Sequence, residues 1–304
     1  MDFQGKYLKF LIIGFLLSCL ISCGENNPVE NTNGEDTLAF GEESTLEIVT
    51  WNIQEFPKKG QTTISKVEKV IRDSDVDIFA LQEITDTASL NQLIANLSEY
   101  DGLYSEDTYN GYYLKTGIIY KKDMIEITSY SQLFWGDWYA FTRPPLLLEI
   151  IAEKDGNLFD FNLIILHLKS GSGWEEIDRR RAAACSLKNY IDGKVAIEEE
   201  KDYIVAGDWN DEIDDPEEEN SFNVFIADST NYKFLTWPLA GNQYYASWPH
   251  YPYYSLIDHI LISKDCFDEF DNGSIETLRL DDNIINYFQI ISDHRPVMAK
   301  FPVF

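Results

Sequence analysis

The sequence predicts an α/β fold with two packed β-sheets and helices on the outside. Short apolar runs suited to strands alternate with amphipathic segments, and the strand runs outnumber the helical ones. In the middle of the chain the strand runs crowd together, as antiparallel hairpins would. No second linker, low-complexity insert or internal repeat follows Leu46, so we expect one folded domain from Leu46 to Phe304.

The domain opens in a strand–helix–strand–helix order. The strands are expected at 46–53 and 76–83, and the helices at 63–74 and 88–100. Three strand runs follow without a helix between them, then one long helix, then three more strands. These elements are expected at 116–122, 145–153 and 158–168, then 174–191 for the helix, then 202–208, 256–263 and 295–301.

The first 22 residues have the features of a bacterial lipoprotein signal peptide. Lys6 and Lys9 precede an apolar run too short to span a membrane comfortably, and the run ends in LISC, residues 20–23. This ending resembles a lipobox, which implies cleavage before Cys23 and lipid attachment to its sulfur; the alternatives are an uncleaved signal anchor or cleavage elsewhere. Residues 23–45 are polar and acidic, so we expect a flexible tether. A monomeric, extracytoplasmic cell-envelope lipoprotein, at the outer membrane or cell surface, is the corresponding expectation.

Charge and cysteine content limit the function classes. A formal net charge of -28 repels a polyanion at long range, which counts against a non-enzymatic nucleic-acid binder. It does not exclude a nuclease in which positive charge is confined to the active site and comes from a few side chains or a bound metal ion. Cys185 and Cys266 remain in the folded part and could pair or stay free, and no Cys/His zinc spacing exists.

Polar side chains stand at one end of six separate strand runs. Any one of them could be a strand-end cap or a turn residue. However, three of the four histidines lie in these positions, and a fold that gathers strand ends at one rim would bring the groups together. The residues are Asn52, Glu83, His167, Asp208 with Asn210, Asp258, and Asp293 with His294.

This set of residues predicts a phosphoester hydrolase. Carboxylate and amide oxygens suit Mg²⁺ or Mn²⁺, which can polarise a phosphoryl oxygen. An imidazole beside a carboxylate can move protons near neutral pH. No motif for a serine or cysteine nucleophile is present.

In their order, TWNI, LQE, HLKSG, GDWN, IDHI and SDHRPV resemble the motifs of the endonuclease/exonuclease/phosphatase superfamily, the deoxyribonuclease-like fold. The resemblance implies a four-layered α/β/β/α sandwich, with two mixed β-sheets packed face to face and helices outside. It implies metal binding by Asn52, Glu83 and Asp293, and phosphate contacts by His167 and Asn210. It also implies that Asp208 activates water or the leaving group, that Asp258 is catalytic, and that Asp293 orients His294.

Within the superfamily, the chain looks most like secreted deoxyribonucleases, where Arg143 matches an arginine that reaches the active-site phosphate. Thr85 replaces an expected DNA-backbone arginine, and no glutamate near Leu114 and Lys115 supports the first histidine. We therefore expect a Mg²⁺- or Mn²⁺-dependent phosphodiesterase, first a nuclease acting on DNA or RNA. A phosphatase or phosphodiesterase acting on a small-molecule or lipid phosphoester is the alternative, and a non-catalytic surface binding protein is the third hypothesis.

Three further segments left alternatives open. Lys169 and the run Arg179–Arg181 could supply cations for phosphate, or the run could be a solvated helix face with one arginine paired to an acid. The acidic loop 211–220 could repel a long polyanion, bind a structural Ca²⁺, or simply face solvent. The aromatic stretch 237–254 is expected to serve core and loop packing, with a base-stacking or lipid-contact surface as the alternative.

Overall fold

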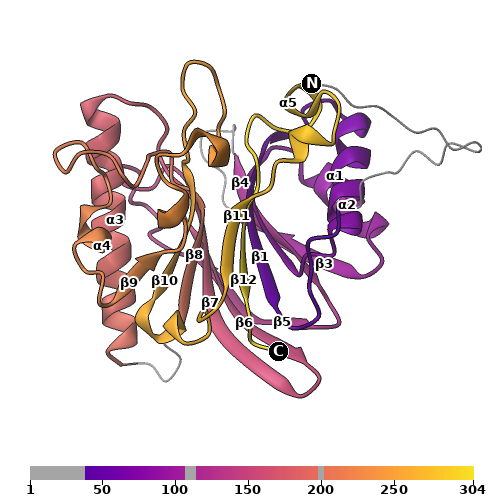
Figure 1. The fold of residues 1–304 in the computed structure, drawn as a ribbon, viewed down its shortest axis with the longest axis horizontal. Coiled ribbons are helices and arrows are strands. Elements are labelled where there is room, and N and C mark those ends of the chain that lie inside the picture. Colours follow the sequence, from indigo (N-terminus) through magenta and orange to yellow (C-terminus); the bar gives the residue numbers. More distant parts are fainter. Residues whose placement is uncertain (1–37, 107–113, 198–201) are drawn as a thin grey trace, which may run out of the picture. The chain divides into compact units, whose positions relative to one another are not determined.

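The structure is a computed structural model that describes residues 38–106, 114–197 and 202–304. These residues form two six-stranded mixed sheets. The first sheet has the order β11-β12-β1-β2-β4-β3 and the second the order β5-β6-β7-β8-β10-β9. In Figure 1 the sheets stand side by side in the centre, with α1 and α2 against one and α3 and α4 against the other.

The strands of the first sheet are β1 (Leu46–Phe56), β2 (Ile78–Ile84), β3 (Tyr100–Tyr104), β4 (Lys115–Lys121), β11 (Ser274–Thr277) and β12 (Val297–Phe301). Those of the second are β5 (Ile125–Gln132), β6 (Leu146–Lys154), β7 (Asn157–His167), β8 (Tyr203–Asp208), β9 (Tyr232–Phe234) and β10 (Asp258–Ser263). The α-helices are α1 (Gln61–Ser74), α2 (Thr87–Asn96), α3 (Trp174–Val195), α4 (Asn223–Ile226) and α5 (Tyr287–Ile290). Short 3-10 turns are η1 (Trp237–Leu239), η2 (Gln243–Tyr245), η3 (Lys264–Phe267) and η4 (Leu280–Asp282).

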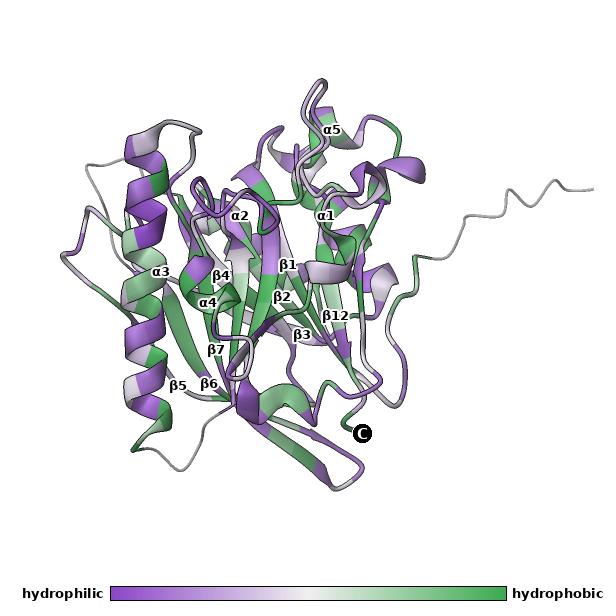
Figure 2. Cartoon of the chain, turned by 60° about the vertical axis from the view of Figure 1, so that its left-hand side comes forward, coloured by the Kyte–Doolittle hydropathy of each residue, from purple (hydrophilic) through white to green (hydrophobic). Residues whose placement is uncertain are grey.

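Alternation along the strands builds three apolar layers. In β1, Ile48 faces the second sheet, whereas Val49 and Trp51 face α1 and α2. Three small side chains, Ala80, Ala206 and Ala299, lie between the two sheets beside larger aliphatic ones. Figure 2 shows the largely hydrophobic strands behind α3, whose own surface is mixed. The predicted four-layered α/β/β/α sandwich is confirmed.

Helix α3 carries an unusual residue in its buried stripe. Ile177, Ala184, Leu187 and Ile191 recur at spacings of one or two helical turns, as expected for a surface helix packed on a sheet. Arg180 falls on the same buried side and is 1% exposed. Because a charge is rarely buried unless it is paired, its position indicates a specific partner.

The chain differs from the sequence prediction at its edges. Strands β3, β5, β9 and β11, which lie at the four sheet edges, were not predicted. The helix expected at 88–100 is shorter, because α2 ends at Asn96 and the chain turns into β3 at Tyr100.

Residues 38–45 were expected to belong to the tether, but they contact the domain. Leu38 is buried in the core beside α1, and the backbone N–H groups of Phe40 and Gly41 donate to Ser74 O at 2.8 and 3.0 Å. The folded domain therefore includes them. The rest of the predicted tether, the signal peptide and Cys23 lie outside the described residues.

Two sequence questions are answered by the described residues. Both Cys185, which is exposed, and Cys266, which is buried, are free thiols, so they do not pair. Among the helices described, none has the length and apolar character needed to cross a membrane.

Candidate active site

Strand register in the second sheet aligns three of the predicted groups. Parallel pairing of β7 with β8 places His167 opposite Asp208, and antiparallel pairing of β8 with β10 places Asp208 opposite Asp258. Directly paired residues project to the same face, so the three side chains lie in one row across the sheet. A Cβ atom at Gly207 would meet Leu166 O at 2.1 Å, so only glycine permits this close approach of β8 to β7.

The first sheet contributes Asn52 and Glu83 from the ends of β1 and β2. The pairing of these strands is irregular just beyond Asn52, and Glu83 has a φ of 65°, a conformation that side chains other than glycine seldom adopt. Bulges and strained residues commonly re-aim side chains next to active sites. Here the irregular ends turn both residues toward the second sheet.

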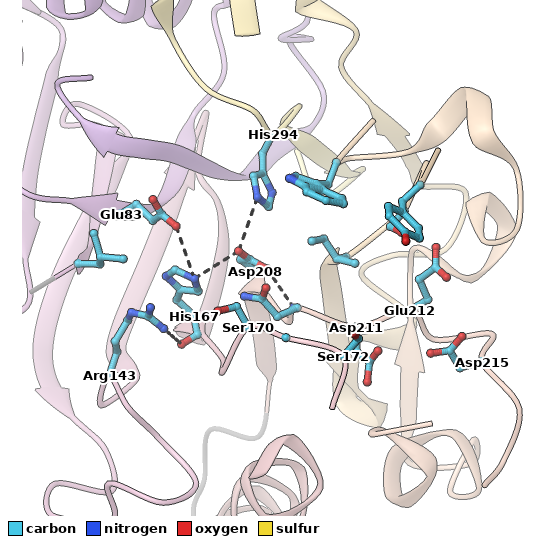
Figure 3. Close-up of a pocket in the computed structure, with 17 residues that line it drawn as sticks. Glu83, Arg143, His167, Ser170, Ser172, Asp208, Asp211, Glu212, Asp215 and His294 are labelled. Atoms are coloured by element: carbon cyan, nitrogen blue, oxygen red, sulfur yellow. Dashed lines mark hydrogen bonds and ion pairs between the residues drawn. The ribbon is translucent and has the colours of Figure 1, made fainter. Parts of the chain in front are cut away.

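Asn52 joins the two halves of the site. Its Nδ2 donates to Glu83 Oε1 at 3.2 Å and to Asp208 Oδ2 at 3.0 Å. The Nε2 atom of His167 lies 3.4 Å from Asp208 Oδ2 and 3.8 Å from Glu83 Oε1. Residues from both sheets therefore meet in one cluster, of which Figure 3 shows Glu83, His167 and Asp208.

His294 stands just before β12 and completes the cluster. Its Nδ1 is 2.7 Å from Asp258 Oδ2, and its Nε2 is 3.9 Å from Asp208 Oδ2. The backbone around it is also held, because Tyr287 donates its hydroxyl to His294 O at 2.6 Å and the N–H of His294 donates to Ser292 Oγ at 3.0 Å. The imidazole is thus fixed between two carboxylates, Asp258 and Asp208.

The two histidines are pushed toward opposite protonation states. Burial alone would lower the pKa of His294, but the negative charges of Asp258 and Asp208 raise it to about 10. Burial, followed by the positive charge of Arg143, lowers the pKa of His167 well below its usual value. Burial and the nearby Asp258 carboxylate raise the pKa of Asp208 to about 7. Titratable neighbours driven apart in this way are typical of acid–base sites.

These groups open onto a pocket of about 650 Å³. Arg143 lines it and is fixed by donating through Nη1 to His167 O and Leu168 O, both at 3.3 Å. Asn210 also lines the pocket, donating through Nδ2 to Leu168 O at 3.2 Å and through its backbone N–H to Asp208 Oδ1 at 3.0 Å. A pocket that contains these groups of shifted pKa is the natural candidate for the active site.

The profile of the Endonuclease/Exonuclease/phosphatase family matches residues 49–294, which is most of the chain. The chain belongs to this family. Sequence comparison with curated proteins finds no match.

Solved structures similar to this family member have low sequence identity. The human Nocturnin catalytic domain with bound sulfate has a TM-score of 0.62 at 20% identity, covering 86% of this chain and 95% of that one. A mannosyl-6-phosphatase of Bacteroides thetaiotaomicron has a TM-score of 0.61 at 16% identity, covering 84% and 98%. TDP2 of D. rerio, complexed with a single-strand DNA product, has a TM-score of 0.61 at 17% identity, covering 85% of this chain and 99% of that one. These similarities establish the fold.

The sequence assigned Asp293 as the acid that orients His294, but the structure places a different acid against the imidazole. Asp258 makes that contact, whereas Asp293 places its carboxylate 3.8 Å from His250 Nε2 and does not line the pocket. Its backbone N–H donates to Gln54 Oε1 at 3.0 Å. The acid that orients His294 comes from a neighbouring strand and not from the adjacent residue.

The predicted phosphate-binding cations, apart from Arg143, lie elsewhere. Lys169 donates to Ser170 O at 2.7 Å and is not among the pocket residues. Arg179 donates to backbone carbonyls of the 138–139 segment. Arg180 is buried and pairs with Asp211 at 2.9 Å, and Arg181 donates to carbonyls of the acidic loop. Two arginines of the run therefore pair with acids, buried Arg180 with Asp211 and partly exposed Arg181 with Asp178 at 3.3 Å.

The oxygen donors at the base of the pocket fit a divalent metal ion, which the family implies. Carboxylate oxygens of Asp208 and Asp258 lie within 4.8 Å of each other, and Asp258 Oδ1 is buried with no hydrogen-bond partner in the described part of the chain. Glu83 adds a carboxylate on the other side of Asp208. The amide oxygen of Asn52 accepts from a backbone N–H, so its predicted role as a ligand stays a prediction.

Sequence reasoning missed the residues that brace the cluster. Ser292 donates to Asn52 O while accepting from the N–H of His294, so it ties the ends of two strands. Trp51 donates its indole N–H to the Tyr287 hydroxyl at 3.0 Å, which extends this brace into the core. Ser292 precedes the Asp-His pair and could have been suspected, whereas Tyr287 lies in a four-residue helix with no sequence signal.

One ring nitrogen of His167 is left without a partner in the described part of the chain. The Nδ1 atom of His167 is buried and has no hydrogen-bond partner among the described residues. This agrees with the sequence, which offers no supporting glutamate near Leu114. A buried polar atom without a partner costs free energy and is expected mainly where function requires it.

Proposed function

We propose that the chain is a divalent-metal-dependent phosphoester hydrolase. The observation that carries this proposal is the cluster in which Glu83 and Asp208 lie beside two histidines of opposite pKa shift, His167 and His294. Family membership supports the reaction class. A non-catalytic binding protein would need no such opposed pair.

Each residue has a role that follows from its surroundings. Asp208, with its raised pKa, accepts a proton from water near neutral pH. His294 carries a proton and stabilises negative charge on the phosphate, while neutral His167 binds a phosphoryl oxygen. Arg143 holds the phosphate as a charged donor. A Mg²⁺ or Mn²⁺ ion, held by Glu83 beside Asn52, would polarise the phosphoryl group.

The metal requirement is tested with the purified full-length protein in mild detergent. We expect hydrolysis of bis-p-nitrophenyl phosphate with Mn²⁺, loss of activity in EDTA, and recovery on adding Mn²⁺ or Mg²⁺. Glu83→Gln should lower activity at least tenfold and weaken the metal dependence. Glu126→Gln, on the exposed side of edge strand β5, is the matched control. Turnover that persists in EDTA would refute the metal claim.

The described cations favour a compact substrate over a long nucleic acid. Arg143 is the one lysine or arginine among the described residues that line the pocket, and Lys169 and Arg179–Arg181 are engaged elsewhere. A protein that binds a polynucleotide normally contacts several successive phosphates with lysine and arginine. A phosphatase or phosphodiesterase acting on a small phosphoester therefore leads, and the similarity to a mannosyl-6-phosphatase is consistent with it.

A nuclease is the second candidate. Its support is the motif likeness to secreted deoxyribonucleases, with Arg143 in the pocket, and the similarity to a TDP2 structure with a single-strand DNA product. Plasmid DNA, RNA and small phosphoesters compared in one panel would separate the two candidates. Faster cleavage of DNA or RNA than of every small phosphoester would place the nuclease first.

We also propose that the protein is a cell-envelope lipoprotein anchored through Cys23. The support is the N-terminal sequence: two lysines, an apolar run and LISC. Labelling with a palmitate analogue should mark the wild type and fail for Cys23→Ala. Labelling of the alanine variant at the same level would refute the anchor.

A further inference from the structure

The pocket extends well beyond the catalytic cluster. On the far side from Glu83 and Arg143, Figure 3 shows Glu212 and Asp215. Aromatic and hydroxyl side chains line the same pocket, namely Trp248, Tyr253 and Ser255. We call these five residues, Glu212, Asp215, Trp248, Tyr253 and Ser255, the aromatic–acidic lobe. Nothing in the hydrolytic reaction requires them.

The aromatic side of the lobe is a small hairpin. Trp248 and Ser255 exchange backbone hydrogen bonds of 2.9 and 3.2 Å. The ring of His250 packs edge-on against Trp248 with centroids 4.5 Å apart, and its Nε2 lies 3.8 Å from Asp293 Oδ2. The hairpin is therefore attached to the segment that carries His294. Tyr253 is 65% exposed and stands at the open side.

The acidic side of the lobe is held by buried contacts. Arg180 donates to Asp211 Oδ2 from Nε at 3.1 Å and from Nη2 at 2.9 Å. The ring of His259, which is fully buried, contacts Asp211 O through Nε2 at 3.0 Å. These contacts fix the start of the loop and so position Glu212 and Asp215 toward the pocket. Arg180 and His259 therefore hold the first residue of the acidic loop in place.

The lobe contains two carboxyl groups, Glu212 and Asp215, which favour a ligand that donates hydrogen bonds over one that carries negative charge. Burial, then the charges of Asp211 and Glu212, raise the pKa of Asp215 to about 7, and burial raises that of Glu212. Among the described residues, no lysine or arginine lines this lobe. A second phosphate group here would face several carboxylates, and that repulsion would be stronger than in water. Hydroxyl groups, in contrast, can donate to these carboxylates.

The cavity and its aromatic wall give an independent indication of a ring-shaped ligand. A volume of about 650 Å³ is ample for a phosphate plus a six-membered sugar ring. Trp248 offers an aromatic wall against which the apolar C–H face of such a ring can pack.

We propose that the aromatic–acidic lobe binds a polyhydroxylated leaving group, so that the substrate is a sugar monophosphate and not a polynucleotide. This rests on the proposed phosphoester hydrolysis and names its substrate class. In the reaction, the water oxygen forms a bond to phosphorus and the ester P–O bond to the sugar breaks. One water proton ends on the sugar oxygen, and the products are the free sugar and inorganic phosphate. Sites built to hydrogen-bond hydroxyl groups discriminate strongly against ligands that lack them.

The experiment compares substrates on the full-length protein with Mn²⁺. The substrates are mannose 6-phosphate, glucose 6-phosphate, phosphocholine, single-stranded DNA and bis-p-nitrophenyl phosphate. We expect kcat/KM for a hexose phosphate to exceed that for DNA, per phosphate, by at least 100-fold. The variants Glu212→Gln and Asp215→Asn should each raise KM for hexose phosphate at least fivefold. Both should improve the use of DNA, because they remove repulsive charge.

Controls separate this inference from the proposed function. Glu126→Gln also replaces a carboxylate by a carboxamide, but at an exposed position, so it should change neither substrate preference nor KM. Thermal melting of each variant checks that it is folded. If the wild type with Mn²⁺ hydrolyses none of these phosphoesters, the proposed function itself fails. If it hydrolyses any of them but DNA, phosphocholine or bis-p-nitrophenyl phosphate is the best substrate, or the lobe variants leave hexose KM unchanged, the sugar assignment alone is overturned.

Discussion

Replacing Asp258 by asparagine should abolish most activity, whereas the same change at Asp293 should be nearly silent. Asp258 is fully buried, and its Oδ2 lies 2.7 Å from His294 Nδ1. At an effective dielectric of about 20, opposite charges at this distance attract by about 6 kcal/mol. Desolvation of the pair offsets part of this, which leaves about 4 kcal/mol. That corresponds to a loss in kcat of about 1,000-fold for Asp258→Asn.

The change at Asp293 should be much smaller because of its surroundings. Its side chain is 23% exposed, its ion-pair partner His250 is 44% exposed, and their closest atoms are 3.8 Å apart. Exposed pairs of this kind contribute about 0–1 kcal/mol, so Asp293→Asn should cost less than about fivefold. Asp293 also affects the pKa of His294 less than Asp258 or Asp208 does.

The assay is steady-state hydrolysis of bis-p-nitrophenyl phosphate with Mn²⁺ across pH 5–10, with metal saturation checked for each variant. Loss of the Asp258 charge should also lower the pKa of His294, so the residual activity should fall as pH rises past neutrality. The wild type should keep His294 protonated up to about pH 10. A loss for Asp293→Asn equal to or greater than that for Asp258→Asn would refute the assignment of Asp258 as the orienting acid.

Two further predictions concern stability. Burial, together with Asp77, raises the pKa of Glu47 to about 8, so the folded protein binds a proton there and wild-type stability should fall as pH rises from about 4.5 to 8. Glu47→Gln should remove that dependence and melt several degrees above the wild type at pH 9; an equal difference between the two proteins at pH 5 and pH 9 would contradict it. Gly207→Ala should cost about 3 kcal/mol or more, with loss of activity, because the new Cβ meets Leu166 O. Gly193→Ala, in α3 with open space, should melt at or above the wild-type temperature, and equal effects of the two alanines would contradict the steric reasoning.

The sequence predicted the interior of each sheet and missed its edges, for a physical reason. The eight predicted strands correspond to the eight interior ones, which are paired on both sides and carry continuous apolar runs. The edge strands lack that pattern: β5 reads IEITSYSQ and is mostly exposed, and β9 has only three residues. A strand paired on one side is set by its neighbour and needs little apolar surface of its own.

The structure brings together several of the residues that the sequence singled out, but the sequence did not indicate which of them contact one another. Strand-end position was enough to gather Asn52, Glu83, His167 and Asp208, because the ends of the two sheets meet. It could not say which acid orients His294. Consecutive side chains leave the backbone in different directions, so a neighbour in sequence is often a poor candidate for contact.

The run Arg179–Arg181 illustrates the same limit in a helix. Successive helical residues point about 100° apart, so three adjacent arginines cannot form one cationic face. Arg180 falls on the buried stripe and holds the acidic loop, while its neighbours reach backbone carbonyls on either side. A cluster of charge in the sequence is therefore not a cluster in space.

The small side chains between the sheets have a consequence for catalysis. Ala80 lies three residues before Glu83, and Ala206 lies two residues before Asp208, both in the apolar layer that separates the two sheets. Because the site takes its groups from both sheets, these alanines act as spacers that set the gap bridged by the amide of Asn52. A larger residue at either alanine would push the two sheets apart and so separate Asn52 from Asp208. Hydrolytic activity could thus be lowered by a substitution in the core, away from the substrate.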